Sequence, residues 1–326
     1  MGPRGISSVV VVSWLVLGAA GVAYASRTGV PAWAAGFLLA AFLIEGPLYL
    51  LAGMETGRAA FARLPRDVQP WVLGLSALAP YLIYSIPCGV YQWPHFGTLA
   101  GLIGLMAFWY CVAPRHALFD VLFLALFGML MLSSTFKTIY AAPAGAPRVD
   151  ILGKLMWVRL AVLAVVVGRG FPVAFGFLPS AAQWKIGARQ FLLFLPVGAA
   201  VGFGLGIFQL DKAMPWAPQT ALTALGAFLG TLLVVAYFEE FIFRGVLQQW
   251  LGEWMGRPIL GLILTSAIFG ASHLPFRFFP NWKFALLAAI AGLFYGRAYR
   301  EARDTRAAMA AHALVVTVWT VALGKA

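Results

Sequence analysis

Long apolar stretches, separated by short polar segments, form the main pattern along the chain. A helix that crosses a bilayer needs about 20 mostly apolar residues, and the chain repeatedly provides stretches near this length, bounded by charge, proline or glycine. The pattern predicts an all-α polytopic membrane protein, a bundle of about 10-11 transmembrane helices. The apolar stretches cover residues 9–25, 31–53, 70–92, 96–113, 117–136, 151–168, 190–210, 219–250, 258–278, 282–298 and 307–323.

Two loops divide these stretches into regions. A segment rich in Ala, Pro and Gly covers residues 140–147, and a more polar stretch covers residues 180–189. Such composition is typical of connections between compact regions. We therefore predict a domain boundary near residue 180, with an N-terminal transmembrane region of unassigned role over 1–180 and a second domain over 181–326.

Composition and charge agree with a chain embedded in lipid. Of the 326 residues, 62% are hydrophobic and 10% are charged, whereas soluble domains carry about a quarter charged residues. The net charge is +12, but the basic residues stand singly or in short groups, without a basic face that could follow a phosphate backbone. This distribution excludes nucleic acid as a partner. We interpret the charge as contacts with the lipid bilayer, in a multi-pass protein of the cell (inner) membrane.

Ionisable residues inside predicted spans are costly, and they indicate functional sites. One predicted span contains two adjacent glutamates, Glu239 and Glu240, followed by Arg244. On a helix, Glu240 and Arg244 are four residues apart and share a face, so they can form an ion pair. Glu239 is rotated by about 100° from Glu240. It therefore lacks this partner and is suited to acid or base chemistry.

Two histidines follow in later spans. If the chain reverses at residues 255–257, antiparallel helices bring Glu239 and His273 to the same depth in the bilayer. His312 reaches that depth only if residues 248–255 lie at the membrane interface. A carboxylate and two imidazoles in an apolar cavity can activate a water and hold an oxyanion, as peptide hydrolysis requires. The same set can also bind zinc, and the residues alone do not separate the two possibilities.

Taken together, these motifs resemble the CPBP family of CAAX prenyl endopeptidases and bacteriocin-processing or self-immunity membrane proteins. The resemblance covers roughly residues 190 to 326, and its first two motifs are the specific ones. The matching residues are Glu239-Glu240-x-x-x-Arg244 with Gly245, then Phe269-x-x-x-His273, and then His312.

The resemblance implies an all-helical intramembrane protease of the glutamic type, without a cofactor, although zinc is not excluded. Glu239 would match the carboxylate that activates water, assisted by His273, and His312 would match the histidine that stabilises the oxyanion. Glu240 and Arg244 would support the site. The implied substrate is a membrane-associated protein or peptide. Because high Ala and Gly with Arg above Lys indicates a bacterium, we expect a bacteriocin precursor, a sorting-signal protein or a membrane regulator.

One position departs from the family pattern. The third motif usually has Asn or Asp four residues after the histidine, whereas this chain has Val316. The neighbouring Thr317 offers a hydroxyl, but it is rotated by about 100°. The departure favours an alternative, a non-catalytic membrane scaffold or bacteriocin-immunity protein of the same fold. We expect an active variant enzyme, because the other two motifs are intact.

Two acidic residues of the first region, Glu45 and Asp120, also lie in predicted spans. We expect them to form hydrogen bonds between helices or to lie at a membrane boundary, rather than to contact a substrate. With Glu239 they could instead form the proton relay of a transporter. The absence of internal repeats and the clustering of the motifs in one half of the chain disfavour that hypothesis.

Overall fold

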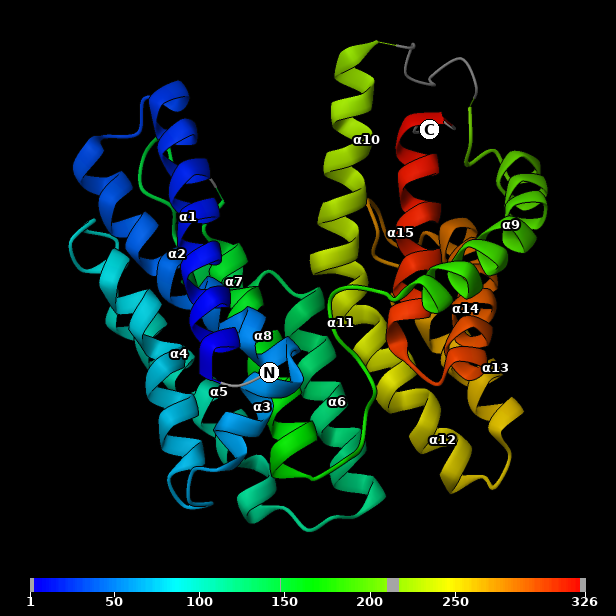
Figure 1. The fold of residues 1–326 in the computed structure, drawn as a ribbon, viewed down its shortest axis with the longest axis horizontal. Helices are drawn as coiled ribbons and strands as arrows, with labels where there is room; N and C mark the ends of the chain where they lie inside the picture. Colours follow the sequence, from blue (N-terminus) through cyan, green and yellow to red (C-terminus); the bar gives the residue numbers. More distant parts are fainter. Residues whose placement is uncertain (1–2, 147, 210–216, 323–326) are drawn as a thin grey trace. The chain divides into compact units, whose positions relative to one another are not determined.

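The structure is a computed structural model that describes residues 3–146, 148–209 and 217–322. These residues form helices and connecting loops, and no strand occurs among them. The chain divides into two compact units, an N-terminal unit of Met1–Pro172 and a C-terminal unit of Val173–Ala326 (Figure 1). The division falls within the non-helical stretch 169–180, whereas the sequence predicts the boundary near residue 180.

In the N-terminal unit, α2 packs against α1, α3, α4 and α8. A π-helical segment, η1, continues α8. The bounds are α1 Pro3–Thr28, α2 Ala32–Gly53, α3 Glu55–Ala62, α4 Gln69–Ser85, α5 Trp93–Val112, α6 Ala117–Leu132, α7 Thr135–Ile139, α8 Asp150–Leu163 and η1 Ala164–Gly168.

Two buried ion pairs link helices of this unit. Glu45 on α2 accepts hydrogen bonds from Arg159 on α8 at 2.9 and 3.0 Å. Asp120 on α6 accepts hydrogen bonds from Arg169 at 2.7 and 2.8 Å and from Tyr110 on α5 at 3.1 Å. Both carboxylates are fully buried, so each needs such a partner. The expectation that Glu45 and Asp120 join helices is confirmed.

The C-terminal unit begins with an extended stretch and then forms a helical bundle around α14 and α15. Two π-helical segments, η3 and η4, lie within one long helix of this bundle. The bounds are α9 Ala181–Gly204, α10 Pro218–Gly230, η3 Thr231–Val235, α11 Ala236–Glu240, η4 Phe241–Leu247, α12 Gln248–Trp254, α13 Pro258–Ala271, α14 Trp282–Ala302 and α15 Thr305–Ala322.

Small residues let the helices of this bundle approach closely, as is common in membrane proteins. A Cβ added to Gly187 on α9 would lie 2.6 Å from Ala310 Cβ on α15, and one added to Gly270 on α13 would lie 2.5 Å from Ala285 O on α14. The long helix ends at Trp254, and the positive φ of 61° at Gly256 allows the turn into α13. These contacts bring α11, α13, α14 and α15 together (Figure 1).

The structure confirms the all-α polytopic membrane class. Seven helices in the described ranges are long and apolar enough to cross a membrane, whereas the sequence predicts about 10-11 spans. Each remaining predicted stretch contains a helix, but α4, α6 and α13 are short and α14 carries charges near both ends. The apolar stretches there are longer than the helices, because α4 ends before Pro87 and α13 ends before Pro275.

Candidate active site

Both glutamates lie on α11, the five-residue α-helical segment between the π segments η3 and η4. Helix α15, which carries His312, packs directly against α11. A π segment changes the rotation of the side chains that follow it, and such segments occur often at functional sites. The α-helical periodicity used for the sequence prediction does not reveal them. Glu239 and Glu240 nevertheless point in different directions and have different partners.

Glu240 is held by a cation and by a histidine. Arg244 Nη1 donates a hydrogen bond to Glu240 Oε1 at 3.3 Å, and Arg244 Nε lies 3.1 Å from Oε2, close enough for an ion pair but without hydrogen-bond geometry. His312 Nδ1 lies 2.8 Å from Glu240 Oε1. Glu240 and Arg244 are both fully buried. The ion pair predicted from their spacing is confirmed, and together the two side chains are electrically neutral.

Arg244 also contacts α13 and α14. Its Nη2 donates to Gly292 O at 3.2 Å, and its guanidinium carbon lies 4.3 Å from the centre of the Phe269 ring, within the range of a cation–π contact. One turn later, Gln248 Nε2 donates to Gly296 O at 3.3 Å. Two consecutive turns of α14 therefore accept hydrogen bonds from two consecutive turns of the long helix.

Among the described residues, Glu239 is the carboxylate of the pair that forms no ion pair with Arg or Lys. Its side chain is 16% exposed, and its Oε2 is buried without a hydrogen bond in the described part of the chain. His312 Nε2 lies 3.9 Å from Glu239 Oε2. This distance is too long for a direct hydrogen bond. Glu239 therefore lies outside the ion pair of Glu240 and Arg244, as its helical position predicts.

His312 lies between the two glutamates and is fixed by its neighbours. Because an ionised carboxylate only accepts hydrogen bonds, we assign the proton of the neutral imidazole to Nδ1, facing Glu240. This leaves the lone pair of Nε2 on the side of Glu239. The ring stacks on Tyr295 of α14, with 4.7 Å between ring centres and an angle of 13°. The orientation of His312 is thus set from two directions.

His273 lies on the turn that follows α13. Its Nδ1 is 2.7 Å from Phe269 O and 3.2 Å from Ser272 Oγ. The carbonyl can only accept, so Nδ1 carries a proton and Nε2 is the free nitrogen of the neutral ring. No contact found in the described ranges joins His273 directly to Glu239. The ring of Phe269 touches both imidazoles, with 4.7 Å between ring centres to His273 and 6.0 Å to His312.

The position of the family's third-motif amide lies one turn after His312. Val316 occupies it and is half-buried, so no polar side chain faces the site from there. The hydroxyl of Thr317 donates to Ala313 O at 2.7 Å, within its own helix. Thr317 therefore does not supply the missing donor.

A catalytic zinc ion usually needs three protein ligands close together. Among the described residues, no group of three or more His, Cys, Asp and Glu side chains is placed to hold a metal ion. Arg244 neutralises Glu240, and the nitrogen of His312 nearest to that carboxylate carries a proton. Glu240 and Nδ1 of His312 are therefore already engaged with each other and with Arg244. The expectation of a cofactor-free site remains a prediction.

Sequence reasoning missed the contribution of α14. Tyr295, which supports His312, is an aromatic residue in an apolar helix, where simple packing is the usual role. Gly292 and Gly296, whose carbonyls bind Arg244 and Gln248, are spaced four residues apart. With Ala288 they form a small residue at every fourth position of the helix. This spacing is the signal that could have indicated close helix packing at the site.

Comparison with known families agrees with this geometry. Residues 221–318 match the family described as type II CAAX prenyl endopeptidase Rce1-like. The matched segment contains the two glutamates, both histidines and Arg244. No curated protein and no solved structure gives a significant match to the chain. Residues 221–318 of this multi-pass membrane protein are therefore similar to the Rce1-like family, in agreement with the resemblance to CPBP proteins.

Proposed function

We propose that the protein is an intramembrane endopeptidase, in which Glu239 activates a water that hydrolyses a peptide bond of a membrane-associated protein or peptide. The observation that carries this proposal is the contrast between the two adjacent glutamates. Glu240 is neutralised by Arg244, whereas Glu239 has no Arg or Lys partner in the described ranges and lies 3.9 Å from the unprotonated nitrogen of His312. A general base needs a free carboxylate of this kind.

One water fits between Glu239 and His312 in this proposal. Groups 3.9 Å apart are readily bridged by a water that makes two hydrogen bonds of about 2.8 Å. Glu239 takes one proton from this water, and the resulting hydroxide adds to the carbonyl carbon of the substrate. When the tetrahedral intermediate collapses, Glu239 returns the proton to the leaving amine. The water oxygen remains in the new C-terminal carboxylate.

The geometry favours roles for the two histidines that differ from those implied by the resemblance. His312, held by Glu240 and Tyr295, orients the water. His273 has a free Nε2 and, when protonated, can donate a hydrogen bond from it to the oxyanion. This donor is the more important because Val316 replaces the usual amide of the third motif.

The proposal is tested in the native host by comparing protein termini from membranes and medium. The chromosomal Glu239→Gln and His312→Ala variants are compared with wild type and with Glu253→Gln, an exposed glutamate on α12 that serves as the matched control. We expect one set of termini to disappear in the first two strains and to persist in the control. Termini that remain unchanged in all strains would contradict the proposal.

A second candidate, the non-catalytic scaffold or immunity protein, is favoured by Val316 alone. It predicts that Glu239→Gln leaves every phenotype of the wild-type strain intact, whereas deletion of the whole gene does not. The same set of strains therefore separates the two functions.

A further inference from the structure

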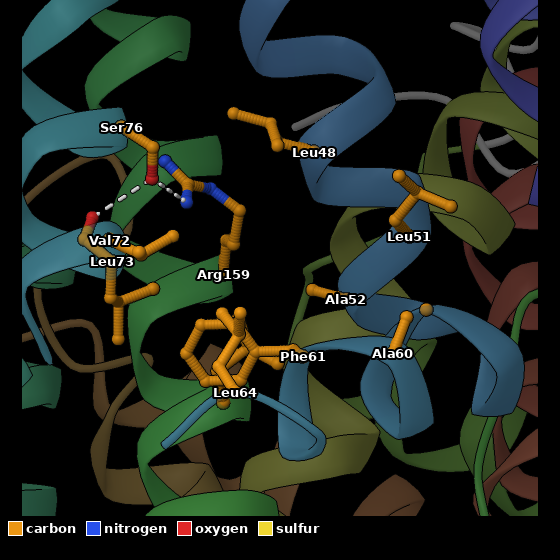
Figure 2. A pocket seen from close by; sticks show the side chains of 12 residues that line it. Leu48, Leu51, Ala52, Ala60, Phe61, Leu64, Val72, Leu73, Ser76 and Arg159 are labelled. Atoms are coloured by element: carbon orange, nitrogen blue, oxygen red, sulfur yellow. Dashed lines mark hydrogen bonds between the residues drawn. The ribbon is translucent and has the colours of Figure 1, made fainter. Parts of the chain in front are cut away.

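A cavity of about 280 Å³ lies within the N-terminal unit, between α2, α3, α4 and α8. Figure 2 shows its side chains, with Arg159 among apolar residues and Ser76 beside its guanidinium group. The walls are apolar except at these two residues. Leu48, Leu51 and Ala52 come from α2, Ala60 and Phe61 from α3, Leu64 from the loop that follows, and Val72 and Leu73 from α4.

Arg159 has more N–H donors at this cavity than the described residues accept. Its guanidinium carries five N–H groups. Two of them donate to Glu45, and a third donates to Ser76 Oγ at 2.9 Å. The hydroxyl of Ser76 itself donates to Leu73 O. The described part of the chain offers no acceptor for the other two, although the side chain is only 2% exposed. A buried donor without a partner is costly, so these two N–H groups favour a ligand that brings an acceptor.

The charge of the site restricts what that acceptor can be. Glu45 already neutralises Arg159 through two hydrogen bonds. A second buried anion at Arg159 would therefore have no counter-charge of its own, which is strongly unfavourable in apolar surroundings. A neutral acceptor, such as the carbonyl of an ester, meets the two N–H groups without this cost.

The helix α3 places the mouth of the cavity at the membrane surface. It follows directly after the apolar helix α2 and packs closely on its end, since a Cβ at Gly57 would collide with the backbone of Leu51. Phe61 and Leu64 line the cavity, whereas Arg63 and Arg66 are exposed. A short amphipathic segment of this kind lies in the interface, where its basic side chains attract the phosphates of anionic lipid.

The depth of the polar groups matches the structure of a phospholipid. Ser76 lies seven residues after Gln69, the first residue of α4, which corresponds to about 10 Å along a helix. The polar headgroup region of one leaflet is about 5 to 8 Å thick, so Ser76 and Arg159 lie just below it. Ester carbonyls occupy this level in a bilayer, between the phosphates and the acyl chains.

We propose that the cavity binds one anionic glycerophospholipid. Its phosphate contacts Arg63 and Arg66, an ester carbonyl accepts hydrogen bonds from Arg159, and the first methylenes of one acyl chain pack against Leu48 and Val72. The volume is adequate, because an engineered cavity of about 150 Å³ already holds benzene. The lipid would link α2, α3, α4 and α8 and would be retained when the protein leaves the bilayer.

The first test uses two neighbouring alanines of α3. Ala60 lines the cavity, whereas Ala59 is exposed and does not. Full-length wild type, Ala60→Trp and Ala59→Trp are incorporated into vesicles of equal parts phosphatidylcholine and phosphatidylglycerol, extracted, and examined by native mass spectrometry. We expect wild type and Ala59→Trp to retain one phosphatidylglycerol, and Ala60→Trp to retain at least about tenfold less, because the indole fills the cavity. Equal retention by the two tryptophan variants would overturn the proposal.

The second test needs only wild-type protein and therefore does not depend on how a variant folds. Phosphatidylglycerol with ester-linked chains is compared with its ether-linked analogue, which has the same headgroup but no carbonyl. Loss of the hydrogen bond to Arg159 should reduce retention by about threefold to tenfold. Equal retention of the two lipids would refute the contact with Arg159.

A third test concerns the contact between the lipid headgroup and the two arginines. The double substitution Arg63→Gln and Arg66→Gln should abolish the preference for phosphatidylglycerol over phosphatidylcholine. A preference that survives, or a wild-type protein that retains both lipids equally, would contradict an anionic occupant. All three readouts measure lipid rather than proteolysis, so their failure leaves the proposed enzyme untouched.

Discussion

At the scale of single residues, Glu239 and Glu240 show how two adjacent glutamates acquire different roles. Helix geometry alone predicts that only Glu240 faces Arg244, and the structure has this ion pair at 3.1 Å. The link from Glu240 to His312 was not predictable in the same way, because 72 residues separate the two partners. Long-range contacts of this kind depend on how α11 and α15 pack, which periodicity does not specify.

Substitution of each glutamate should therefore have a different effect. Glu240→Gln leaves Arg244 buried without a counter-charge and should destabilise the protein by about 3–5 kcal/mol. Glu239→Gln removes no ion pair with a cation, and should change stability by less than about 1 kcal/mol while abolishing proteolysis. Thermal unfolding of both variants in the same detergent measures the difference. Similar melting temperatures for the two variants would contradict the assignment of partners.

Val316 allows a test in the opposite direction, a gain of activity. Val316→Asn places a carboxamide one turn after His312, where the family's third motif usually has one. If the oxyanion lacks a donor, proteolysis should rise by about tenfold or more, since one oxyanion donor is worth about 100-fold to 1000-fold in rate. The rate at which the Glu239-dependent termini appear measures this. An unchanged or lower rate in a stable Val316→Asn protein would mean that the donor is already supplied elsewhere.

At the scale of elements, the fit between the long helix and α14 depends on glycine. A Cβ at Gly292 would lie 3.2 Å from both Arg244 Nη2 and Ser266 Cβ, closer than normal contacts. By contrast, a Cβ at Gly226 on α10 would meet no atom within 4 Å. The sequence indicates that these helices form but not that η3 and η4 are π segments, because their apolar residues fit either geometry.

The two glycines form a matched pair for substitution. Gly292→Ala should cost about 1–3 kcal/mol of stability and reduce proteolysis, because Arg244 must move and Glu240 moves with it. Gly226→Ala should be neutral or stabilising, by up to about 1 kcal/mol, since alanine favours helix more than glycine does. Unfolding and proteolysis are measured on both proteins. Equal effects of the two changes would show that the packing around Gly292 is not critical.

At the scale of the whole molecule, the sequence predicts the fold class better than it predicts the helix lengths and the contacts between helices. The membrane class follows from stretches such as 31–53, which the structure confirms as Ala32–Gly53. The predicted stretches around Pro87 and Pro275 are longer than their helices, because the sequence there stays apolar after the helix has ended. The sequence predicts that Glu45 pairs with another group, because a buried carboxylate needs a partner. It does not identify Arg159 as that partner, because Arg159 is 114 residues away.

The Glu45–Arg159 pair also separates an enzyme from a transporter. Arg159→Met alone leaves Glu45 buried and unpaired and should destabilise the N-terminal unit by about 3–5 kcal/mol. The double variant Glu45→Leu with Arg159→Met should recover most of this stability, and it should retain the Glu239-dependent cleavage. Unfolding measurements and counts of protein termini test both statements. Loss of function in a stable double variant would favour the proton relay of a transporter.

The most direct test of the central claim follows the oxygen of the attacking water. Membranes of the deletion strain are supplied with wild-type or Glu239→Gln protein in water labelled with oxygen-18, and new C-termini are analysed by mass spectrometry. Hydrolysis by a Glu239-activated water predicts new C-terminal carboxylates that carry one labelled oxygen with wild type, and none with Glu239→Gln. If the same labelled termini form with both proteins, or if wild type forms none, Glu239 is not the catalytic base of a protease.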